Sequence, residues 1–296
     1  MVQLLETDVQ TKEVLSWTGL HVFHYGMSSC SQKLRIFLNL KGLRWESHPI
    51  DIPANEHLTP YYLGINPRGL LPAIVENGAV HIESNDIMLH LEKAHPEPRL
   101  LPCELEDETA RQLAIENDLH FDLRTLTFRF LFDPATPSKT KEDLRRYASS
   151  GSGTVRGERD ADLQREIAFW SSFLDHGISD DEARAAAHRL HNAFTKVDAA
   201  LGTSRHILGE AVTMVDIAWL VYAQRLIHAG YPIDDLYPNM AKWRTQLMRH
   251  PDIAGELEMP DGLCAMIAQR QRFLADTGQM LVDICFRRGG TIIGFS

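Results

Sequence analysis

The stretch Ser28-Ser29-Cys30-Ser31-Gln32-Lys33-Leu34-Arg35-Ile36 places hydroxyl and thiol side chains where a predicted strand gives way to a predicted helix. The preceding residues 20–25 alternate loosely between apolar and polar, as in a short strand. Beyond the stretch, apolar residues recur at helical spacing up to Gly42, a residue type that commonly ends helices. The hydroxyl and thiol groups are therefore expected on a loop or on the first helical turn, where unpaired N–H groups and the positive end of the helix dipole favour a thiolate.

The same stretch allows three interpretations. In the simplest, the serines cap the helix and Cys30 is a small buried side chain, since Ser is a frequent N-cap and cysteine is commonly buried. In the second, Cys30 is itself a reactive thiol. In the third, Ser28 or Ser29 donates a hydrogen bond to the thiolate of a bound ligand.

Signals for strands and short helices alternate over the following residues. Pro72 stands near the start of one apolar run, where it cannot donate a ladder hydrogen bond and where a cis peptide bond is plausible. Asn77-Gly78 is a strong signal for a hairpin turn. Strands are expected at 20–25, 45–52, 70–75 and 79–82, and short helices near 55–62 and at 83–93.

This order, β-α-β-α-β-β-α, predicts an α+β chain that begins with a thioredoxin-like domain. The domain is expected at 19–102, on a mixed four-stranded sheet, after an N-terminal extension at 1–18. Three prolines between residues 96 and 102 mark a linker at its end.

The chain changes character after this linker. Long stretches rich in Ala, Leu, Glu and Arg repeat apolar residues with a period near 3.6, which predicts an all-helical domain at 103–280. A polar stretch near 133–160 contains Gly and Ser and is expected to be a flexible insertion. Thr213 and Asp216 form a capping pair before an apolar segment, which we expect to be the buried central helix. Helices are predicted at 106–130, 160–176, 180–201 and 217–230.

The composition limits the possible functions. A net charge of -10 and a pI near 5.8 argue against a nucleic-acid or anionic-membrane partner. The four cysteines have irregular spacing, which gives neither a disulfide nor a zinc pattern, so no metal site is predicted. Cys103 and Cys264 are interpreted as inert thiols. Because no targeting signal opens the chain, a cytoplasmic location is the simplest expectation.

The C-terminal tail at 281–296 has two short apolar runs on either side of Arg287-Arg288-Gly289-Gly290. Both runs are too short to span a bilayer, so no membrane span is predicted. We expect the tail to cover the active-site cleft, to pair with a partner subunit, or to stay partly ordered.

From Tyr25 to Pro102 the sequence resembles the glutathione-binding domain of cytosolic glutathione transferases. The Ser28-Ser29-Cys30-Ser31 start is most similar to the zeta class and more loosely to tetrachlorohydroquinone dehalogenase. The run from Asn55-Glu56-His57 to Asn66-Pro67 is similar to theta-class and bacterial β-etherase-type transferases. The resemblance implies glutathione as a cosubstrate and a helical second domain that binds the other substrate.

The resemblance also implies roles for individual residues in glutathione binding. The backbone of Leu71, before Pro72, would pair with the cysteinyl amide. Ser84 and its helix N-terminus would hold the γ-glutamyl carboxylate, with Glu83 toward the ammonium group. His57 would reach the glycyl carboxylate.

Three functions compete. In the first, Ser28, Ser29 or Cys30 stabilises the glutathione thiolate for attack on a hydrophobic, aromatic electrophile, by conjugation, ether cleavage or dehalogenation. In the second, Cys30 forms a mixed disulfide with glutathione as a monothiol reductase, since Lys33 stands where a CxxC partner would be; a zeta-like isomerase is a related alternative. In the third, the chain is a non-catalytic binding or regulatory protein.

The helical domain is expected to line the pocket for the electrophile. The candidates are apolar and aromatic residues that fit a core position equally well. They are Leu123, Leu126, Phe130, Trp170, Phe173, Trp219 and Tyr222. The resemblance further implies a homodimer, and closed twofold pairs are the commonest assembly.

Overall fold

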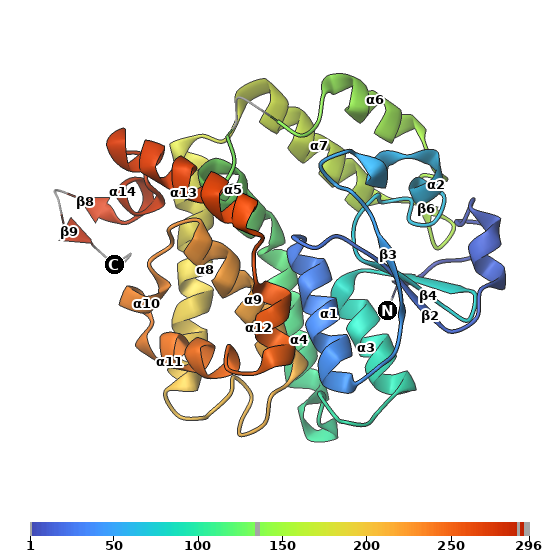
Figure 1. Cartoon of the computed structure of the whole chain (residues 1–296), viewed down its shortest axis with the longest axis horizontal. Helices are drawn as coiled ribbons and strands as arrows, with labels where there is room; N and C mark the ends of the chain where they lie inside the picture. Colours follow the sequence, from blue (N-terminus) through green and yellow to red (C-terminus); the bar gives the residue numbers. More distant parts are fainter. Residues whose placement is uncertain (1, 134–136, 289–290, 293–296) are drawn as a thin grey trace. The chain divides into compact units, whose positions relative to one another are not determined.

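The computed structural model describes residues 2–133, 137–288 and 291–292 (Figure 1). These residues form two compact units. The first unit contains residues 2–99 together with 137–176, and the second contains 100–133 together with 177–288 and 291–292. We call 137–176 the returning segment, because there the chain goes back to the first unit.

The first unit is built on a mixed five-stranded sheet with the order β1-β5-β4-β2-β3. Strands β2 and β3 are parallel, whereas β2–β4, β4–β5 and β5–β1 are antiparallel. The four predicted strands are present, and the N-terminal extension adds a fifth at one edge. The strands are β1 (Val2–Gln3), β2 (Leu20–His24), β3 (Glu46–Pro49), β4 (Ala73–Glu76) and β5 (Ala79–Ile82).

Helices α1 (Ser29–Lys41) and α3 (Ser84–Ala94) pack against each other in this unit (Figure 1). Gly42 ends α1 with φ of 63°, a left-handed conformation that glycine adopts at little cost. The sheet residues Phe23, Ala73 and Val75 belong to a buried cluster with the N-terminal segment. The remaining short helices of this region are η1 (Lys12–Ser16), η2 (Glu56–Leu58) and α2 (Pro60–Leu63).

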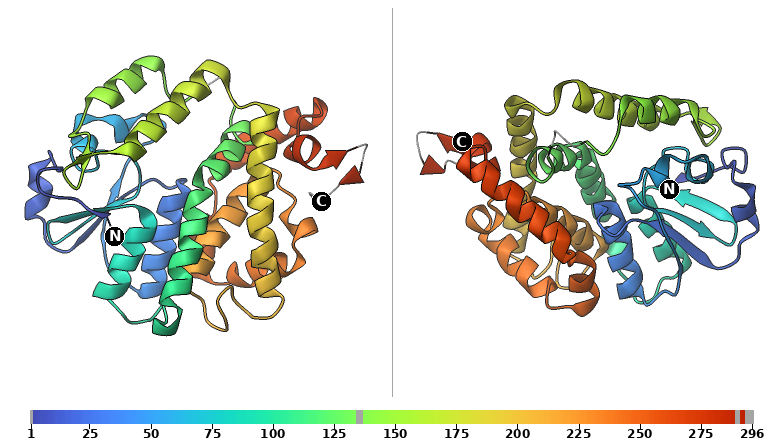
Figure 2. Two further views of the ribbon diagram at one scale, coloured as in Figure 1. Left: turned by 180° about the vertical axis from the view of Figure 1, so that it is seen from behind. Right: turned by 45° about the horizontal axis from the view of Figure 1, so that its top comes forward.

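The returning segment is ordered where the sequence predicted a flexible insertion near 133–160. Helix α6 (Lys141–Ser149) begins with a capping box between Thr140 and Asp143, and it lies beside α7 (Ala161–His176), as Figure 2 shows. Between them, β6 (Thr154–Val155) and β7 (Glu158–Arg159) form a small hairpin. The prediction of one continuous all-helical domain at 103–280 is therefore wrong for this segment. The segment contains paired strands and belongs to the first unit.

Buried contacts explain why the returning segment joins the first unit. Tyr147 donates a hydrogen bond to the backbone oxygen of Arg68, and its ring packs with Leu63 and Leu163. Asp8 of the N-terminal extension accepts hydrogen bonds from the Thr154 hydroxyl (2.8 Å) and from backbone N–H groups in the hairpin. Burying apolar side chains and satisfying a buried carboxylate both stabilise this arrangement.

The second unit is helical. The predicted helix at 106–130 is divided at Leu119 into α4 (Glu106–Asp118) and α5 (His120–Phe130), whereas α8 (Asp180–Leu201) has the predicted bounds. None of the described helices is long and apolar enough to cross a membrane. The remaining elements are η3 (Cys103–Leu105), α9 (Met214–His228), α10 (Ile233–Leu236), α11 (Pro238–Leu247), α12 (Pro251–Leu257), α13 (Asp261–Asp276), α14 (Leu281–Cys285), β8 (Arg287–Arg288) and β9 (Thr291–Ile292).

Helix α9 is the buried helix that the sequence predicted. Its Thr213–Asp216 capping box is formed, and Asp216 also accepts hydrogen bonds from the Ile207 N–H (3.1 Å) and the Trp243 indole (2.9 Å). The side chains of α9 are buried along most of its length. This residue pattern is structural, as the sequence analysis expected.

The C-terminal tail packs on α8 within the second unit. Leu281 and Phe286 are buried, and Arg184 of α8 donates a hydrogen bond to the Ile284 oxygen at 3.0 Å. The described part of the tail is therefore anchored to its own unit. Gly289-Gly290 and residues 293–296, which the sequence analysis included in the tail, lie outside the described residues.

Candidate functional site

The N-terminus of α1 presents the side chains of Ser28, Ser29 and Cys30, all of them half-buried. Ser28 is the N-cap, and its hydroxyl accepts a hydrogen bond from the Ser31 N–H at 3.3 Å. Ser29 and Cys30 lie in the first turn, and Cys30 is not part of a disulfide. The three predicted groups are thus together at the positive end of a 13-residue helix.

Arg35 holds the loop that carries these groups. Its guanidinium donates hydrogen bonds to the backbone oxygens of Tyr25 (3.2 Å) and Gly26 (3.0 Å), and the residue is only 7% exposed. Because a guanidinium presents several donors in a fixed plane, it can fix two carbonyls at once. Arg35 belongs to the motif at the start of α1, but no role for it could be predicted from the sequence.

The strand register brings the predicted Leu71 and Glu83 segments to the same end of the sheet as the start of α1. Phe23, Ala73 and Ile82 are aligned across β2, β4 and β5. The loop that follows β2, the segment before β4 and the residues after β5 therefore emerge together. These parts carry the Ser28–Cys30 groups, Leu71 with Pro72, and Glu83 with Ser84.

The backbone at this end of the sheet has some of the features that the sequence predicted. The Leu71–Pro72 peptide bond is cis, as expected. Glu83, rather than Ser84, is the N-cap of α3, and its φ of 69° is unusual for a residue with a side chain. Ser84 is the first helical residue and is 7% exposed. Backbone outliers of this kind cluster at ligand-binding and active sites.

Arg68 is the centre of a buried ion network that the sequence analysis missed. Its guanidinium binds both carboxylate oxygens of Asp160 at 2.8 Å, Glu83 at 2.7 Å and Asp162 at 2.8 Å. Only 9% of the Arg68 side chain is exposed. Burial lowers the pKa of Arg68, but Asp160 and Glu83 outweigh burial and hold the pKa above its ordinary value. The sequence signal for this network was limited to the position of Arg68 directly after Asn66-Pro67.

The network contains more negative than positive charge. Three carboxylates face Arg68, and Asp162 also pairs with Arg165. Glu83 and Asp162 remain about one third exposed, at 32% and 35%. The arrangement can therefore attract a further cation at the N-terminal end of α3.

His57 lies deeper than the sequence suggested. It is 5% exposed, and its Nδ1 has no hydrogen-bond partner among the described residues. Burial, together with the nearby Lys139, lowers the pKa of His57 to about 3, so the imidazole is neutral at physiological pH. Lys139 comes from the returning segment, is 3% exposed and lies over the Trp170 ring at 4.2 Å. Sequence spacing gave no signal that pairs residues 57 and 139.

The candidates for the electrophile pocket are all buried side chains. Trp170 and Phe173 belong to the first unit, whereas the other candidates belong to the second. The second unit also contains a cavity of about 560 Å³ between α4 and α8, which includes Ile115 and Leu119 in its lining. Of the seven predicted residues, Trp219 lines this cavity.

The remaining cysteines belong to the second unit. Cys103 and Cys264 are exposed, and Cys285 is buried in the C-terminal tail. Burial raises the pKa of Cys285 to about 12, so it stays a thiol. Cys103 and Cys264, which the sequence left open as core or surface thiols, are therefore surface thiols.

A thioredoxin-like sheet unit and a helical unit, with this cluster at the start of α1, define the fold of cytosolic glutathione transferases. The family description "Glutathione S-transferase, N-terminal domain" matches residues 27–94, and "Glutathione S-transferase, C-terminal domain" matches 180–246. Both domain descriptions of the glutathione S-transferase family therefore match this chain, each within one of its two units. The whole returning segment lies between the two matched regions.

The relatives include a zeta-class glutathione transferase and a maleylacetoacetate isomerase. The "Glutathione S-transferase zeta class" of Euphorbia esula is 31% identical over 135 residues, which is 45% of this chain and 60% of that protein. A "Maleylacetoacetate isomerase" of Pseudomonas aeruginosa is 39% identical over 85 residues, 28% of this chain and 40% of that protein. The matched regions thus span less than two thirds of these relatives.

Solved structures agree on the fold. The crystal structure of "Beta-etherase LigF from Sphingobium sp. strain SYK-6" superposes with a TM-score of 0.67 at 18% identity. The match covers 81% of this chain and 98% of that protein. At this identity the likeness concerns the fold.

Proposed function

We propose that the protein binds glutathione and stabilises its thiolate for attack on a hydrophobic, aromatic electrophile. The observation that carries this proposal is the aligned row of Phe23, Ala73 and Ile82, because it gathers the α1 N-terminus, the Leu71 segment and the α3 N-terminus. Glutathione is an extended peptide with a thiol, two carboxylates and an ammonium group. It needs a backbone partner, anion sites and a group that stabilises its thiolate.

The sulfur site is the start of α1. A thiolate bound there would receive hydrogen bonds from Ser28 or Ser29 and stabilisation from the helix dipole. Such contacts lower the pKa of a bound thiol and raise the fraction of the reactive thiolate. The electrophile then takes the sulfur electron pair and releases its leaving group, as in conjugation, ether cleavage or dehalogenation.

The γ-glutamyl end fits the N-terminus of α3. Ser84 and the first N–H groups of the helix would bind its carboxylate. The excess negative charge of Glu83, Asp160 and Asp162 around Arg68 would attract its ammonium group. In this proposal the returning segment contributes directly to the glutathione site.

The glycyl carboxylate would bind near His57. A neutral imidazole can donate a hydrogen bond but carries no charge, so the positive charge would come from Lys139. The backbone of Leu71, next to Pro72, would pair with the cysteinyl amide between the two ends, as in β-strand addition.

A second candidate function is a Cys30-dependent thiol transferase. The half-buried thiol of Cys30 in the first turn of α1 favours it, because this position stabilises a thiolate. Lys33, at the position of a second cysteine, donates a hydrogen bond to Asn85 at 2.7 Å, so only a monothiol reaction fits. A zeta-like isomerase would use the same glutathione site.

Calorimetry with glutathione tests the binding proposal. Ser84→Ala should weaken binding about tenfold, or about 1–2 kcal/mol, because a charge-assisted hydrogen bond is lost. Ser179→Ala removes a hydroxyl at the start of α8 and should leave the affinity unchanged. Unchanged affinity in both Ser84→Ala and His57→Ala would contradict the proposed pocket.

Ultraviolet titration of bound glutathione separates the two chemistries. If a hydroxyl stabilises the thiolate, Ser28→Ala or Ser29→Ala should raise the pKa of bound glutathione, and Cys30→Ser should keep most of the activity. If Cys30 forms the mixed disulfide, Cys30→Ser should abolish turnover while glutathione still binds.

The proposed assembly and location follow from the family. A homodimer predicts a sedimenting species of twice 33.5 kDa at micromolar concentration. A cytoplasmic location would keep the cysteine thiols reduced. A 33.5 kDa species alone would contradict the dimer.

A further inference from the structure

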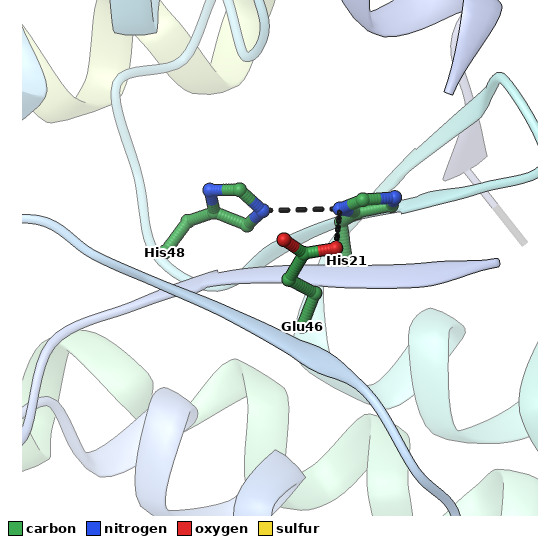
Figure 3. A group of neighbouring side chains, drawn as sticks. All are labelled: His21, Glu46 and His48. Atoms are coloured by element: carbon green, nitrogen blue, oxygen red, sulfur yellow. Dashed lines mark hydrogen bonds and ion pairs between the residues drawn. The ribbon is translucent and has the colours of Figure 1, made fainter. Parts of the chain in front are cut away.

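A cluster of two histidines and one glutamate lies on strands β2 and β3. His21 is paired in register with Glu46, and His48 follows two residues later, so all three side chains lie on one face of the sheet. Figure 3 shows the Glu46 carboxylate and the His48 ring both directed at the same nitrogen of His21. The cluster is separate from the residues assigned to the glutathione site.

The donor atoms are already close to one another. His21 Nδ1 is 3.1 Å from His48 Nε2 and 3.4 Å from Glu46 Oε2. One donor atom from each residue lies within 4.8 Å of the others. Ligands about 2.0–2.1 Å from a tetrahedral zinc ion are separated by roughly 3.3 Å, so little movement is needed to hold one.

The surrounding groups orient the two imidazoles. His21 Nε2 is 3.0 Å from the Thr18 backbone oxygen and donates a proton to it, which leaves the Nδ1 lone pair directed at the cluster. This contact to a carbonyl is typical of histidines that bind metals. The His48 ring stacks on both Trp17 (5.0 Å) and Phe23 (4.7 Å), and Trp17 also contacts His21 at 4.6 Å.

Access and charge also fit a cation. Strand β3 is the last strand in the order of the sheet, and the Glu46 side chain is 70% exposed. Water can therefore reach the cluster and complete the coordination. The carboxylate supplies negative charge, and the two imidazole nitrogens favour borderline transition metals over Mg²⁺ or Ca²⁺.

We propose that His21, Glu46 and His48 form a binding site for Zn²⁺ or a similar divalent transition metal. Each residue supplies one ligand, and water occupies the open position. A metal here links β2 to the edge strand β3. Because it binds the folded arrangement, it stabilises the first unit.

Calorimetry with ZnCl₂ on the full-length, tag-free chain, kept reduced and without glutathione, is the first test. The wild type should bind one Zn²⁺ at this site, and His48→Gln and Glu46→Gln should each weaken that binding by about tenfold or more. Both residues are accessible enough for these variants to fold. Zn²⁺ should also raise the Tm of the wild type, and this rise should be lost in His48→Gln.

The matched control uses another histidine–carboxylate cluster of the same unit. Glu76 contacts His90 at 2.6 Å and His95 at 3.0 Å. The double variant His90→Gln/His95→Gln should bind Zn²⁺ as the wild type does. Equal affinity in the wild type and in His48→Gln would overturn the proposal, as would equal loss in the control.

Spectroscopy gives a second measurement that does not depend on a variant. Co²⁺ at this site should give tetrahedral ligand-field bands without a thiolate charge-transfer band, which excludes binding at a cysteine. Cu²⁺ should quench Trp17 fluorescence, and Trp17→Phe should remove that component. A thiolate band, or no spectral change at saturating Co²⁺, would overturn the proposal.

Discussion

Asp216 in the helical unit and Asp160 in the sheet unit are both buried carboxylates, but they are satisfied in different ways. Asp216 accepts hydrogen bonds from neutral donors, including the hydroxyl and N–H of Thr213 three residues away. Asp160 forms a two-bond ion pair with Arg68, which is 92 residues away in the sequence. The first arrangement is a helix cap whose further donors, Ile207 and Trp243, also belong to the helical unit, and the second joins the returning segment to residues 2–99 of the sheet unit.

The comparison shows that similar burial can depend on very different parts of the chain. A cap stabilises one helix and tolerates change elsewhere in the sequence. An ion pair between distant residues instead makes each partner depend on the other, because an unpaired buried charge is costly. The Arg68 network should therefore be the more sensitive of the two sites.

The largest effect is expected for Arg68→Ala. It leaves Asp160 buried without its partner and should destabilise the sheet unit by about 3–5 kcal/mol. Denaturant unfolding measures this change, and amide hydrogen exchange should show lost protection in α6 and α7. Arg111→Ala removes an exposed ion pair with Glu108 and should cost less than about 1 kcal/mol. Equal losses of unfolding free energy in Arg68→Ala and Arg111→Ala would contradict the expected sensitivity of the Arg68 network.

Asp216→Ala should have the next largest effect. It removes the acceptor for the Thr213, Ile207 and Trp243 donors and should cost about 2–3 kcal/mol. Hydrogen exchange should increase at the start of α9, while α6 and α7 keep their protection. Loss of protection in the returning segment would show that the cap is not local.

Asp8→Ala tests a long-range contact made with neutral donors. The variant leaves the donors of Leu5, Thr154, Arg156 and Gly157 without their acceptor and should cost about 2 kcal/mol. Denaturant unfolding of the wild type and of Asp8→Ala at neutral pH measures this loss of stability. A cost near that of an exposed ion pair would contradict the role of Asp8 in holding the hairpin.

The pH dependence of Asp8 follows from its surroundings. Burial raises its pKa, but the hydrogen bonds outweigh burial and hold the pKa below the ordinary value of 3.8. Its contribution is therefore full above the unfolded pKa and is lost as the pH falls through the folded pKa. The stability difference between the wild type and Asp8→Ala should shrink as the pH is lowered. A constant difference would contradict this assignment.

The smallest effects are expected at two matched capping boxes. Thr140→Ala at α6 and Ser179→Ala at α8 should each cost about 1 kcal/mol, because each removes one cap hydroxyl. Thermal unfolding compares them. If Thr140→Ala destabilises the protein much more than Ser179→Ala does, the start of α6 also supports the nearby contacts of Lys139 and His57.

Most of the local structure could be predicted from the sequence. Asn77-Gly78 marked the β4–β5 hairpin, Gly42 marked the end of α1, and the Thr213–Asp216 spacing marked α9. In each case the signal and the structure lie within a few residues. The α1 cluster of the site was found for the same reason.

The remaining features depend on contacts between distant residues. Arg68 with Asp160, and His57 with Lys139, are brought together only when the returning segment folds onto the sheet unit. The His21, Glu46 and His48 cluster depends on the register of β2 with β3, which the sequence pattern did not fix. Polarity alone suggested a flexible insertion at 133–160, because the few buried anchors, such as Tyr147, are widely spaced.

The path of the chain has a consequence for synthesis on the ribosome. The sheet unit is interrupted at residue 99 and is completed only by residues up to 176. Domains generally fold as units during translation, N-terminal first. The sheet unit therefore cannot be completed when its first 99 residues emerge. It must wait for residues that are translated after α4 and α5, and a nascent chain stalled before then would expose the surface that the returning segment covers.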